Sequence, residues 1–246
     1  MKISTRIMGL LFAMVSFSLI IIGFNNTELD TNPNLYESSV SINSRDDLTN
    51  SSKLLGSGVI ISKDGLILTN YHVAYTAPSL SVKFNNESLE QSATIVKLDK
   101  YNDLALIKVD KNFSQKSVAN FETFNNIFKG QDVFAIGTPL NKKFFNLITH
   151  GIVSNKNVAI KMSYNDGTNT SVLVKNLTML DFKTNGGNSG GPLFNSSGNL
   201  IGIMSSTNHE QGVSLAIAIE QINIFLKDAY APNKTIITNL SVFPTY

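Results

Sequence analysis

Short apolar stretches alternate with turn residues along most of the chain from about Lys53 onward. Gly58–Ser62 and Leu66–Thr69 are two of these stretches, and the Asp64-Gly65 pair between them is typical of a hairpin turn. The other stretches of strand length are Ala93–Leu98, Leu104–Val109, Val133–Ile136, Gly151–Ser154, Val172–Val174, Pro192–Phe194, Leu200–Met204 and Ser214–Ile217. Repeated short strands separated by turns predict an all-β barrel or sandwich.

One helix is predicted near the C-terminus, over residues 219–230. Ile222, Phe225, Leu226 and Tyr230 recur at the spacing of one helical face, and the pattern stops before Pro232, which cannot continue a helix. Residues 231–246 follow, and we expect this C-terminal tail to be too short for a further domain.

The first 24 residues carry a different pattern. Lys2 and Arg6 precede the apolar run Ile7–Phe24, which as a helix is close to the thickness of a bilayer. The positive-inside rule then keeps the N-terminus in the cytoplasm and exports the chain from Asn25 to the periplasmic or extracellular side. We therefore predict a single transmembrane anchor. A signal segment that is cleaved, leaving a secreted protein, is the alternative.

The rest of the chain divides into two parts by composition. Residues 25–52 are rich in Asn, Ser, Thr and Asp without sustained periodicity, which predicts a flexible linker. Residues 53–230 show neither an internal repeat nor a break in composition, so we expect them to form the folded domain.

The composition of the chain excludes several classes of partner and of catalytic chemistry. A net charge of +2 over 246 residues is too small to indicate a nucleic-acid partner. The chain has no cysteine, which excludes disulfides, thiolate catalysis and cysteine-bound metals. Any imidazole chemistry must use His72, His150 or His209, and so few candidate ligands predict no metal site.

The richest local signal is the segment Asn185-Gly-Gly-Asn-Ser189-Gly-Gly-Pro192. A serine hydroxyl becomes a nucleophile when a base takes its proton and donors receive the developing oxyanion, and glycines let the backbone turn and aim its N–H groups inward. The segment also fits the G-x-S-x-G elbow of α/β-hydrolases. That family orders its triad Ser, acid, His, whereas no Asp or Glu lies between Ser189 and His209.

The order His, Asp, Ser fits instead, and it is the order of chymotrypsin. His72 follows an apolar strand, and Asp103 directly opens another. Asp99 competes with Asp103, but we expect Asp99 to mark the preceding turn. His150 and His209 are expected at the surface or in loops.

With this order, the chain resembles the HtrA (Deg) family of trypsin-like serine proteases, which act in protein quality control and stress signalling. The resemblance covers roughly residues 53–230. The matching segments are, in order, Gly56-Ser-Gly58-Val-Ile-Ile, Asp64-Gly65-Leu-Ile-Leu-Thr-Asn-Tyr-His72-Val, Asp103-Leu-Ala-Leu-Ile-Lys-Val, Ala135-Ile-Gly-Thr-Pro139, Gly151-Ile-Val-Ser and Gly187-Asn-Ser-Gly-Gly-Pro192. Each segment alone is a weak signal, but six in register are specific.

The resemblance implies two six-stranded antiparallel β-barrels, about 53–125 and 126–219, with the active site between them. His72 is then the general base, Asp103 its orienting carboxylate and Ser189 the nucleophile, while the N–H groups of Gly187 and Ser189 form the oxyanion hole. The implied function is a serine endopeptidase that cleaves unfolded or flexible segments of extracytoplasmic proteins, without a cofactor. A homotrimer is a further expectation from the family.

The segment before the nucleophile departs from the family, which usually has Asp-Ala-Ala-Ile-Asn-Pro-Gly-Asn-Ser there. Lys183 and Thr184 occupy positions near the base of the specificity pocket, to which the resemblance also assigns Met204 and Ser205. A lysine reaching into the pocket favours an acidic residue before the scissile bond; a lysine that points outward or pairs with Asp181 is the preferred alternative. Gly186 replaces a proline, which predicts an oxyanion loop that substrate or assembly must order.

Two further departures concern partners. The family usually carries one or two PDZ domains after the protease domain, and the short tail here predicts none. The loop Asn141–Phe145 adds two phenylalanines, for which contact with a neighbouring subunit or lipid and partial burial both stay open. The alternative function is a non-catalytic, membrane-tethered scaffold or chaperone that keeps the trypsin-like fold.

Overall fold

The computed structural model describes residues 34–46, 48–49, 51–75, 77–85, 87–139, 142–165, 170–208 and 212–230. The predicted anchor over residues 7–24, His209 and the tail 231–246 lie outside these ranges. Among the helices of the described ranges, none combines the length and the apolar character that a membrane crossing requires.

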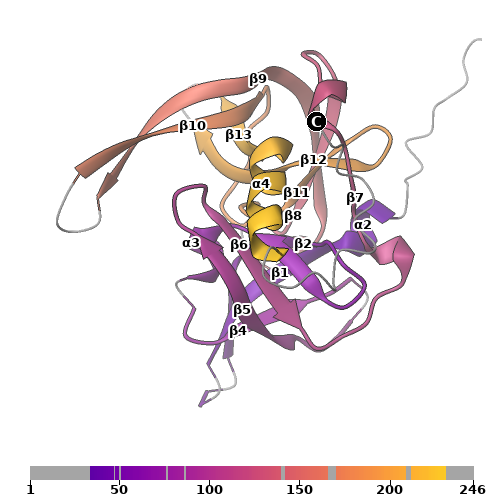
Figure 1. The fold of residues 1–246 in the computed structure, drawn as a ribbon. Helices are drawn as coiled ribbons and strands as arrows, with labels where there is room; N and C mark the ends of the chain where they lie inside the picture. Colours follow the sequence, from indigo (N-terminus) through magenta and orange to yellow (C-terminus); the bar gives the residue numbers. More distant parts are fainter. Residues whose placement is uncertain are drawn as a thin grey trace, which may run out of the picture. The chain divides into compact units, whose positions relative to one another are not determined.

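Six strands form a closed first barrel in the order β1-β2-β3-β6-β5-β4 (Figure 1). All neighbours in this barrel are antiparallel, and β4 pairs back to β1 to close it. The strands are β1 (Ser39–Asp46), β2 (Ser51–Ile60), β3 (Leu66–Thr69), β4 (Leu80–Lys83), β5 (Gln91–Asp99) and β6 (Leu104–Val109). The hairpin predicted at Asp64-Gly65 joins β2 to β3, and Gly65 has the positive φ of 97° that such a turn needs.

The linker prediction for residues 25–52 is wrong for residues 34–46 and 51–52. Residues 34–38 form the short helix α2 (Asn34–Ser38), and β1 is an integral strand of the first barrel. Val40 and Ile42 are fully buried in the barrel core, and the alternate residues Ser39, Ser41 and Asn43 are also fully buried. Both faces of β1 are therefore covered by protein, so its polar residues do not mark a solvent-exposed tether.

Six strands close the second barrel in the order β11-β8-β9-β10-β13-β12, with β11 pairing to β12. These pairings are antiparallel, and the two-residue strand β7 (Asn120–Phe121) adds to β12 in parallel. The strands are β8 (Asp132–Gly137), β9 (Leu147–Asn165), β10 (Thr170–Leu180), β11 (Pro192–Asn195), β12 (Asn199–Asn208) and β13 (Val213–Ala218). The predicted pair of six-stranded barrels is thus confirmed.

The hairpin of β9 and β10 is longer than its barrel requires. Residues 177–180 of β10 pair with β13, whereas residues 170–176 pair with β9 only. Figure 1 shows this part of the hairpin extending as a two-stranded arm. Three single-turn 3₁₀ helices, η1 (Gln115–Ser117), η2 (Phe124–Asn126) and η3 (Lys142–Phe144), lie in the connections between strands.

The C-terminal helix α4 (Ile219–Tyr230) has the bounds expected from its periodicity. Its buried residues Ile219, Ile222, Phe225 and Leu226 belong to one core cluster with residues of both barrels. Lys97 of β5 donates from Nζ to the carbonyl oxygen of Phe225 at 3.0 Å and lies 4.8 Å from the centre of its ring. The helix is therefore attached to the first barrel although it follows the second in sequence.

Three first-barrel strands, β2, β3 and β6, have both faces covered. Ile60, Ile67 and Ile107 pack inside the first barrel, whereas Leu68 and Leu106 belong to the core shared with the second barrel. Because both faces of these strands pack against apolar side chains, they need no polar alternation, which explains the apolar runs in these segments. The ends of β3 and β6 at this shared core carry the candidate site.

Candidate active site

Asp103 enters the site in an unusual backbone conformation. The preceding turn is fixed by Asp99, whose carboxylate accepts hydrogen bonds from the backbone N–H and the side-chain Nδ2 of Asn102, at 3.0 and 2.7 Å. Asp103 then adopts φ of 57°, in the left-handed region, immediately before β6 begins. Asp99 thus marks the turn, as expected, and Asp103 is the carboxylate that reaches the site.

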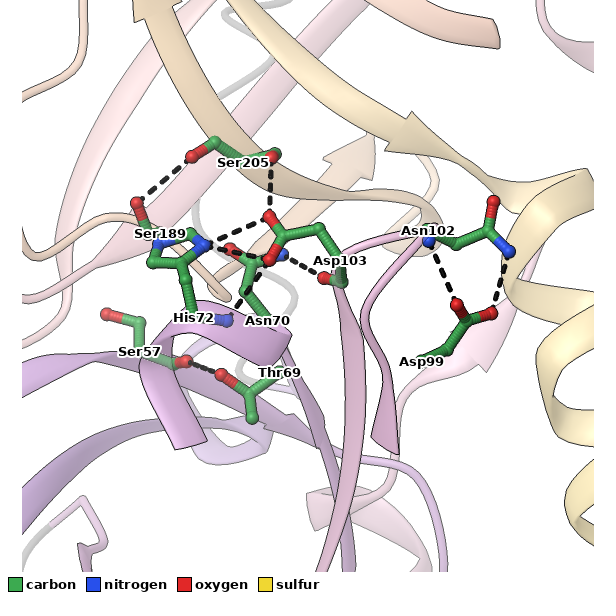
Figure 2. A network of polar contacts seen from close by, with 9 residues as sticks. All are labelled: Ser57, Thr69, Asn70, His72, Asp99, Asn102, Asp103, Ser189 and Ser205. Atoms are coloured by element: carbon green, nitrogen blue, oxygen red, sulfur yellow. Dashed lines mark hydrogen bonds and ion pairs between the residues drawn. The ribbon is translucent and has the colours of Figure 1, made fainter. Parts of the chain in front are cut away.

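His72 lies on α3 (Tyr71–Ala74), the single helical turn that follows β3. Its Nδ1 is 2.9 and 3.0 Å from the two carboxylate oxygens of Asp103, and its backbone N–H donates to Oδ1 at 3.1 Å (Figure 2). An ionised carboxylate only accepts hydrogen bonds, so Nδ1 must carry a proton. In a neutral imidazole this leaves the lone pair on Nε2, the state that a general base requires.

The surroundings of Asp103 favour its charged form. Burial raises the pKa of Asp103, but the hydrogen bond and the charge of His72, together with the hydroxyl of Ser205, outweigh it and lower the pKa below the ordinary value of 3.8. The Asp103 side chain is 13% exposed and that of His72 is 49% exposed. The carboxylate is therefore shielded, while the imidazole faces solvent and an incoming ligand.

Ser205 connects the carboxylate to the predicted nucleophile. Its hydroxyl donates to Oδ2 of Asp103 at 2.9 Å, and its carbonyl oxygen accepts from the hydroxyl of Ser189 at 3.1 Å (Figure 2). Sequence reasoning assigned Ser205 only to the substrate pocket and missed its contact with Asp103. The structure thus gathers His72, Asp103, Ser189 and Ser205 into one polar network.

The turn that carries Ser189 is held against the first barrel by Ser57 of β2. The Ser57 hydroxyl donates to the carbonyl oxygen of Gly187 at 2.7 Å and accepts from the backbone N–H of Thr138 at 3.0 Å. The backbone N–H of Ser57 donates to the carbonyl oxygen of Ser189 at 2.8 Å. Ser57 belongs to the segment Gly56-Ser-Gly58-Val-Ile-Ile, but the sequence predicts no role for it.

Close packing explains two glycines of this turn. Gly187 has φ of 102°, and a Cβ there would lie 2.2 Å from the carbonyl oxygen of Thr138. Gly190 has φ of 82°, and a Cβ there would lie 2.2 Å from both the carbonyl oxygen of Ser57 and Oγ1 of Thr69. A larger residue at position 187 would push the turn away from Thr138 after β8, and one at position 190 would push it away from the first barrel.

The backbone N–H groups around Ser189 differ in what they contact. Those of Asn188, Gly190 and Gly191 donate to the carbonyl oxygens of Asn185, Met204 and Asn188, respectively. Within the part of the chain that the structure describes, the N–H groups of Gly187 and Ser189 donate to no protein acceptor. These two are the donors expected to form the oxyanion hole.

The residues expected near the specificity pocket have different surroundings. Lys183 is exposed and packs near Gly212, so the preferred outward orientation fits it. Asp181 accepts from the backbone N–H of Ile152 at 2.7 Å. Thr184 is 5% exposed and its Oγ1 lies 3.2 Å from the hydroxyl of Ser214, while Met204 is 1% exposed within the core.

The remaining predictions concern Phe144, Phe145 and His150, which are not members of this network. Phe145 is half-buried, so partial burial describes it. Phe144 is 46% exposed, and its contact with a neighbouring subunit or lipid stays a prediction. His150 is exposed, as expected, and its Nε2 lies 2.9 Å from Oδ1 of Asp132.

Comparison with known proteins identifies the family. Residues 56–203 match the trypsin-like peptidase domain. The chain belongs to this family. Its HtrA character is confirmed by named relatives: the serine protease Do-like HtrA of Bacillus subtilis (strain 168) is 37% identical over 203 residues, covering 80% of this chain and 43% of the relative. Serine protease Do-like HtrB of the same organism is 40% identical over 168 residues, covering 66% of this chain and 35% of the relative.

Solved HtrA-type structures share the fold. The serine endoprotease from Yersinia pestis superposes with a TM-score of 0.66 at 27% identity, over 83% of this chain and 67% of its own. The HtrA-type protease AlgW, solved with a decapeptide, also has a TM-score of 0.66, at 24% identity, over 82% of this chain and 68% of its own. The trypsin-like chain described here spans less than half the length of the curated relatives named above.

Proposed function

We propose that this HtrA-type chain is a serine endopeptidase that works through His72, Asp103 and Ser189. The observation that carries the proposal is that Asp103 holds the Nδ1 side of His72 and is joined through Ser205 to Ser189. The N–H groups of Ser189 and Gly187 have no protein acceptor among the described residues. The site thereby combines a base, an orienting carboxylate, a nucleophile and oxyanion donors.

The reaction follows from these positions. The Ser189 hydroxyl leaves the carbonyl oxygen of Ser205, its Oγ bonds to the scissile carbonyl carbon, and its proton passes to Nε2 of His72. The carbonyl π electrons move to the oxygen, which the N–H groups of Gly187 and Ser189 stabilise. The imidazolium protonates the leaving amine as the C–N bond breaks, and a water molecule then hydrolyses the acyl-enzyme by the same steps.

The substrate class is unfolded or flexible segments of extracytoplasmic proteins, cleaved in quality control or regulated proteolysis. This assignment is supported by the resemblance to the HtrA (Deg) family and by the sequence of residues 1–24, which predicts export. The same segment anchors the chain in the membrane with the catalytic domain outside the cytoplasm. Assembly into a homotrimer is part of the proposal.

Degradation of unfolded casein by the full chain, purified in detergent, tests this function. We expect fragments to accumulate with the wild type and not with Ser189→Ala. Ser62→Ala is a matched control, because its hydroxyl accepts the backbone N–H of Leu66 and hydrogen-bonds Asp64 within the β2–β3 hairpin. Casein that binds to the folded wild type without being cut would support the scaffold alternative and contradict the proposal.

A further inference from the structure

Asn70 occupies the position that begins a helix but does not act as its cap. It directly precedes α3 with the extended φ and ψ of an N-cap, −83° and 152°, yet its side chain makes no capping hydrogen bond. Asn is among the residues preferred at this position because its oxygen normally accepts an N–H of the first helical turn. Here Nδ2 instead donates to the backbone carbonyl oxygen of Asp103, at 3.0 Å.

The carboxylate of Asp103 takes over the vacant capping role. His72 is the second residue of α3, and its backbone N–H donates to Oδ1 of Asp103 at 3.1 Å. This is the N–H that an N-cap side chain would ordinarily accept. Asn70 and Asp103 therefore exchange partners: the amide holds the backbone of Asp103, and the carboxylate caps the helix that carries His72 (Figure 2).

This exchange depends on the left-handed backbone of Asp103. At φ of 57° the residue presents its carbonyl oxygen to Asn70 and its carboxylate to His72. L-residues adopt this region rarely and at an energetic cost, so other contacts must hold the conformation. The hydrogen bond from Asn70 acts directly on the Asp103 carbonyl and opposes its rotation to an ordinary negative φ.

Capping alone does not explain an asparagine at this position. Asn70 is fully buried, and its Oδ1 has no hydrogen-bond partner among the described residues. A buried amide oxygen without a partner is destabilising, and a serine would cap the helix without introducing one. What serine lacks is an NH₂ group that can reach the Asp103 carbonyl.

We propose that Asn70 is a positioning residue for the triad, which sets the orientation of the Asp103 carboxylate toward His72 by holding the Asp103 backbone in its left-handed conformation. The inference rests on the proposed serine-protease function. A merely structural role would change stability without changing the His72–Asp103 hydrogen bond.

The variant that tests the role is Asn70→Ser, with Asn70→Thr as a second variant should the smaller residue fail to fold. Asn146→Ser is the matched control, because Asn146 also donates from Nδ2 to a backbone carbonyl at 3.0 Å, that of Tyr36, and also has a buried Oδ1 without a partner in the described ranges. Each substitution thus removes one equivalent hydrogen bond.

Two measurements on the full chain are compared. The first is the rate of labelling by a fluorophosphonate, together with kcat and KM for a peptide substrate. We expect kcat to fall roughly tenfold to a hundredfold in Asn70→Ser with little change in KM. Small misplacements of catalytic groups have effects of that size. The second is the Nδ1–H resonance of His72 in ¹⁵N-histidine-labelled protein, assigned with His72→Ala. We expect it to shift or broaden in Asn70→Ser and to stay unchanged in Asn146→Ser.

The inference would be overturned if Asn70→Ser and Asn146→Ser had the same kcat and the same His72 Nδ1–H resonance. Absence of labelling in the wild type would instead contradict the proposed function. In that case the resonance alone still decides the role of Asn70, so the two failures are distinguishable.

Discussion

The hydroxyl of Ser57 donates a 2.7 Å hydrogen bond to the carbonyl oxygen of Gly187, across the junction of the two barrels. Ser57 belongs to β2 of the first barrel, and Gly187 lies in the turn that carries Ser189 in the second. The same hydroxyl also accepts the N–H of Thr138, which follows β8. One buried side chain therefore joins three segments that border the predicted oxyanion hole.

Replacing Ser57 with alanine is expected to slow acylation while leaving the fold intact. The variant loses the hydrogen bond to Gly187 and leaves the Thr138 N–H without that acceptor, so the Gly187–Ser189 turn becomes less ordered. We expect kcat to fall roughly tenfold, with KM changed less than twofold, as for the loss of a group that acts mainly in the transition state. Steady-state kinetics on a peptide substrate measures this.

Ser41→Ala is the control for Ser57→Ala. Ser41 pairs directly with Ser57 in the β1–β2 register and is equally buried. We expect its kcat to equal that of the wild type. Equal kcat values for the two alanine variants would show that Ser57 does not order the oxyanion turn.

Gly137 tests how tightly the second barrel holds the same turn. A Cβ at Gly137 would lie 2.4 Å from Oδ1 and 3.0 Å from Cα of Asn188, the residue before Ser189. We expect Gly137→Ala to push this turn outward and to slow fluorophosphonate labelling about tenfold or more. Labelling rates of folded protein provide the measurement.

Gly130→Ala separates this steric effect from the general cost of replacing a glycine. Gly130 has φ of 82° but no atom within 4 Å of its would-be Cβ. Strain there lowers the free energy of unfolding by about 1 kcal/mol without touching the site. Equal rates of fluorophosphonate labelling in Gly137→Ala and Gly130→Ala would contradict the steric argument.

Glu122 is expected to make stability depend on acid pH. Burial raises its pKa, but hydrogen bonds from Asn199, the Thr123 N–H, Asn126 and Asn195 outweigh it, so the pKa in the folded protein lies below the ordinary 4.5. A pKa lowered by folding means that the ionised form stabilises the fold. This contribution is complete above the unfolded value and is lost as the pH falls through the lower folded value.

The comparison of wild type with Glu122→Gln measures this contribution by urea unfolding across pH. We expect the wild type to be more stable by about 1 kcal/mol near neutral pH, since its carboxylate accepts several hydrogen bonds. The difference should shrink as the pH falls below 4.5. A difference that is the same at neutral and strongly acid pH would refute the assignment.

The sequence predicted the parts of the fold whose buried residues are apolar. The helix over 219–230 has one apolar face, and its bounds were predicted correctly. β1 was missed because Ser39, Ser41 and Asn43 are polar yet buried against the rest of the protein. Periodicity detects burial only where the buried residues are apolar.

The residues of the candidate site also differ in whether the sequence predicted their roles. His72, Asp103 and Ser189 lie in local motifs, and the structure brings Asp103 against His72 as the motif order implied. Ser57 and Asn70 were not assigned because their partners are 130 and 33 residues away. A buried serine or asparagine has no sequence signal that names its distant acceptor.

Labelling of the full chain with a fluorophosphonate, alongside Ser189→Ala and His72→Ala, tests the central assignment most directly. The account predicts one adduct per chain on the peptide that contains Ser189, none in Ser189→Ala, and a loss of labelling in folded His72→Ala. No adduct on the folded wild type, even with unfolded casein present, or an adduct that persists in Ser189→Ala, would contradict a nucleophilic Ser189 activated by His72.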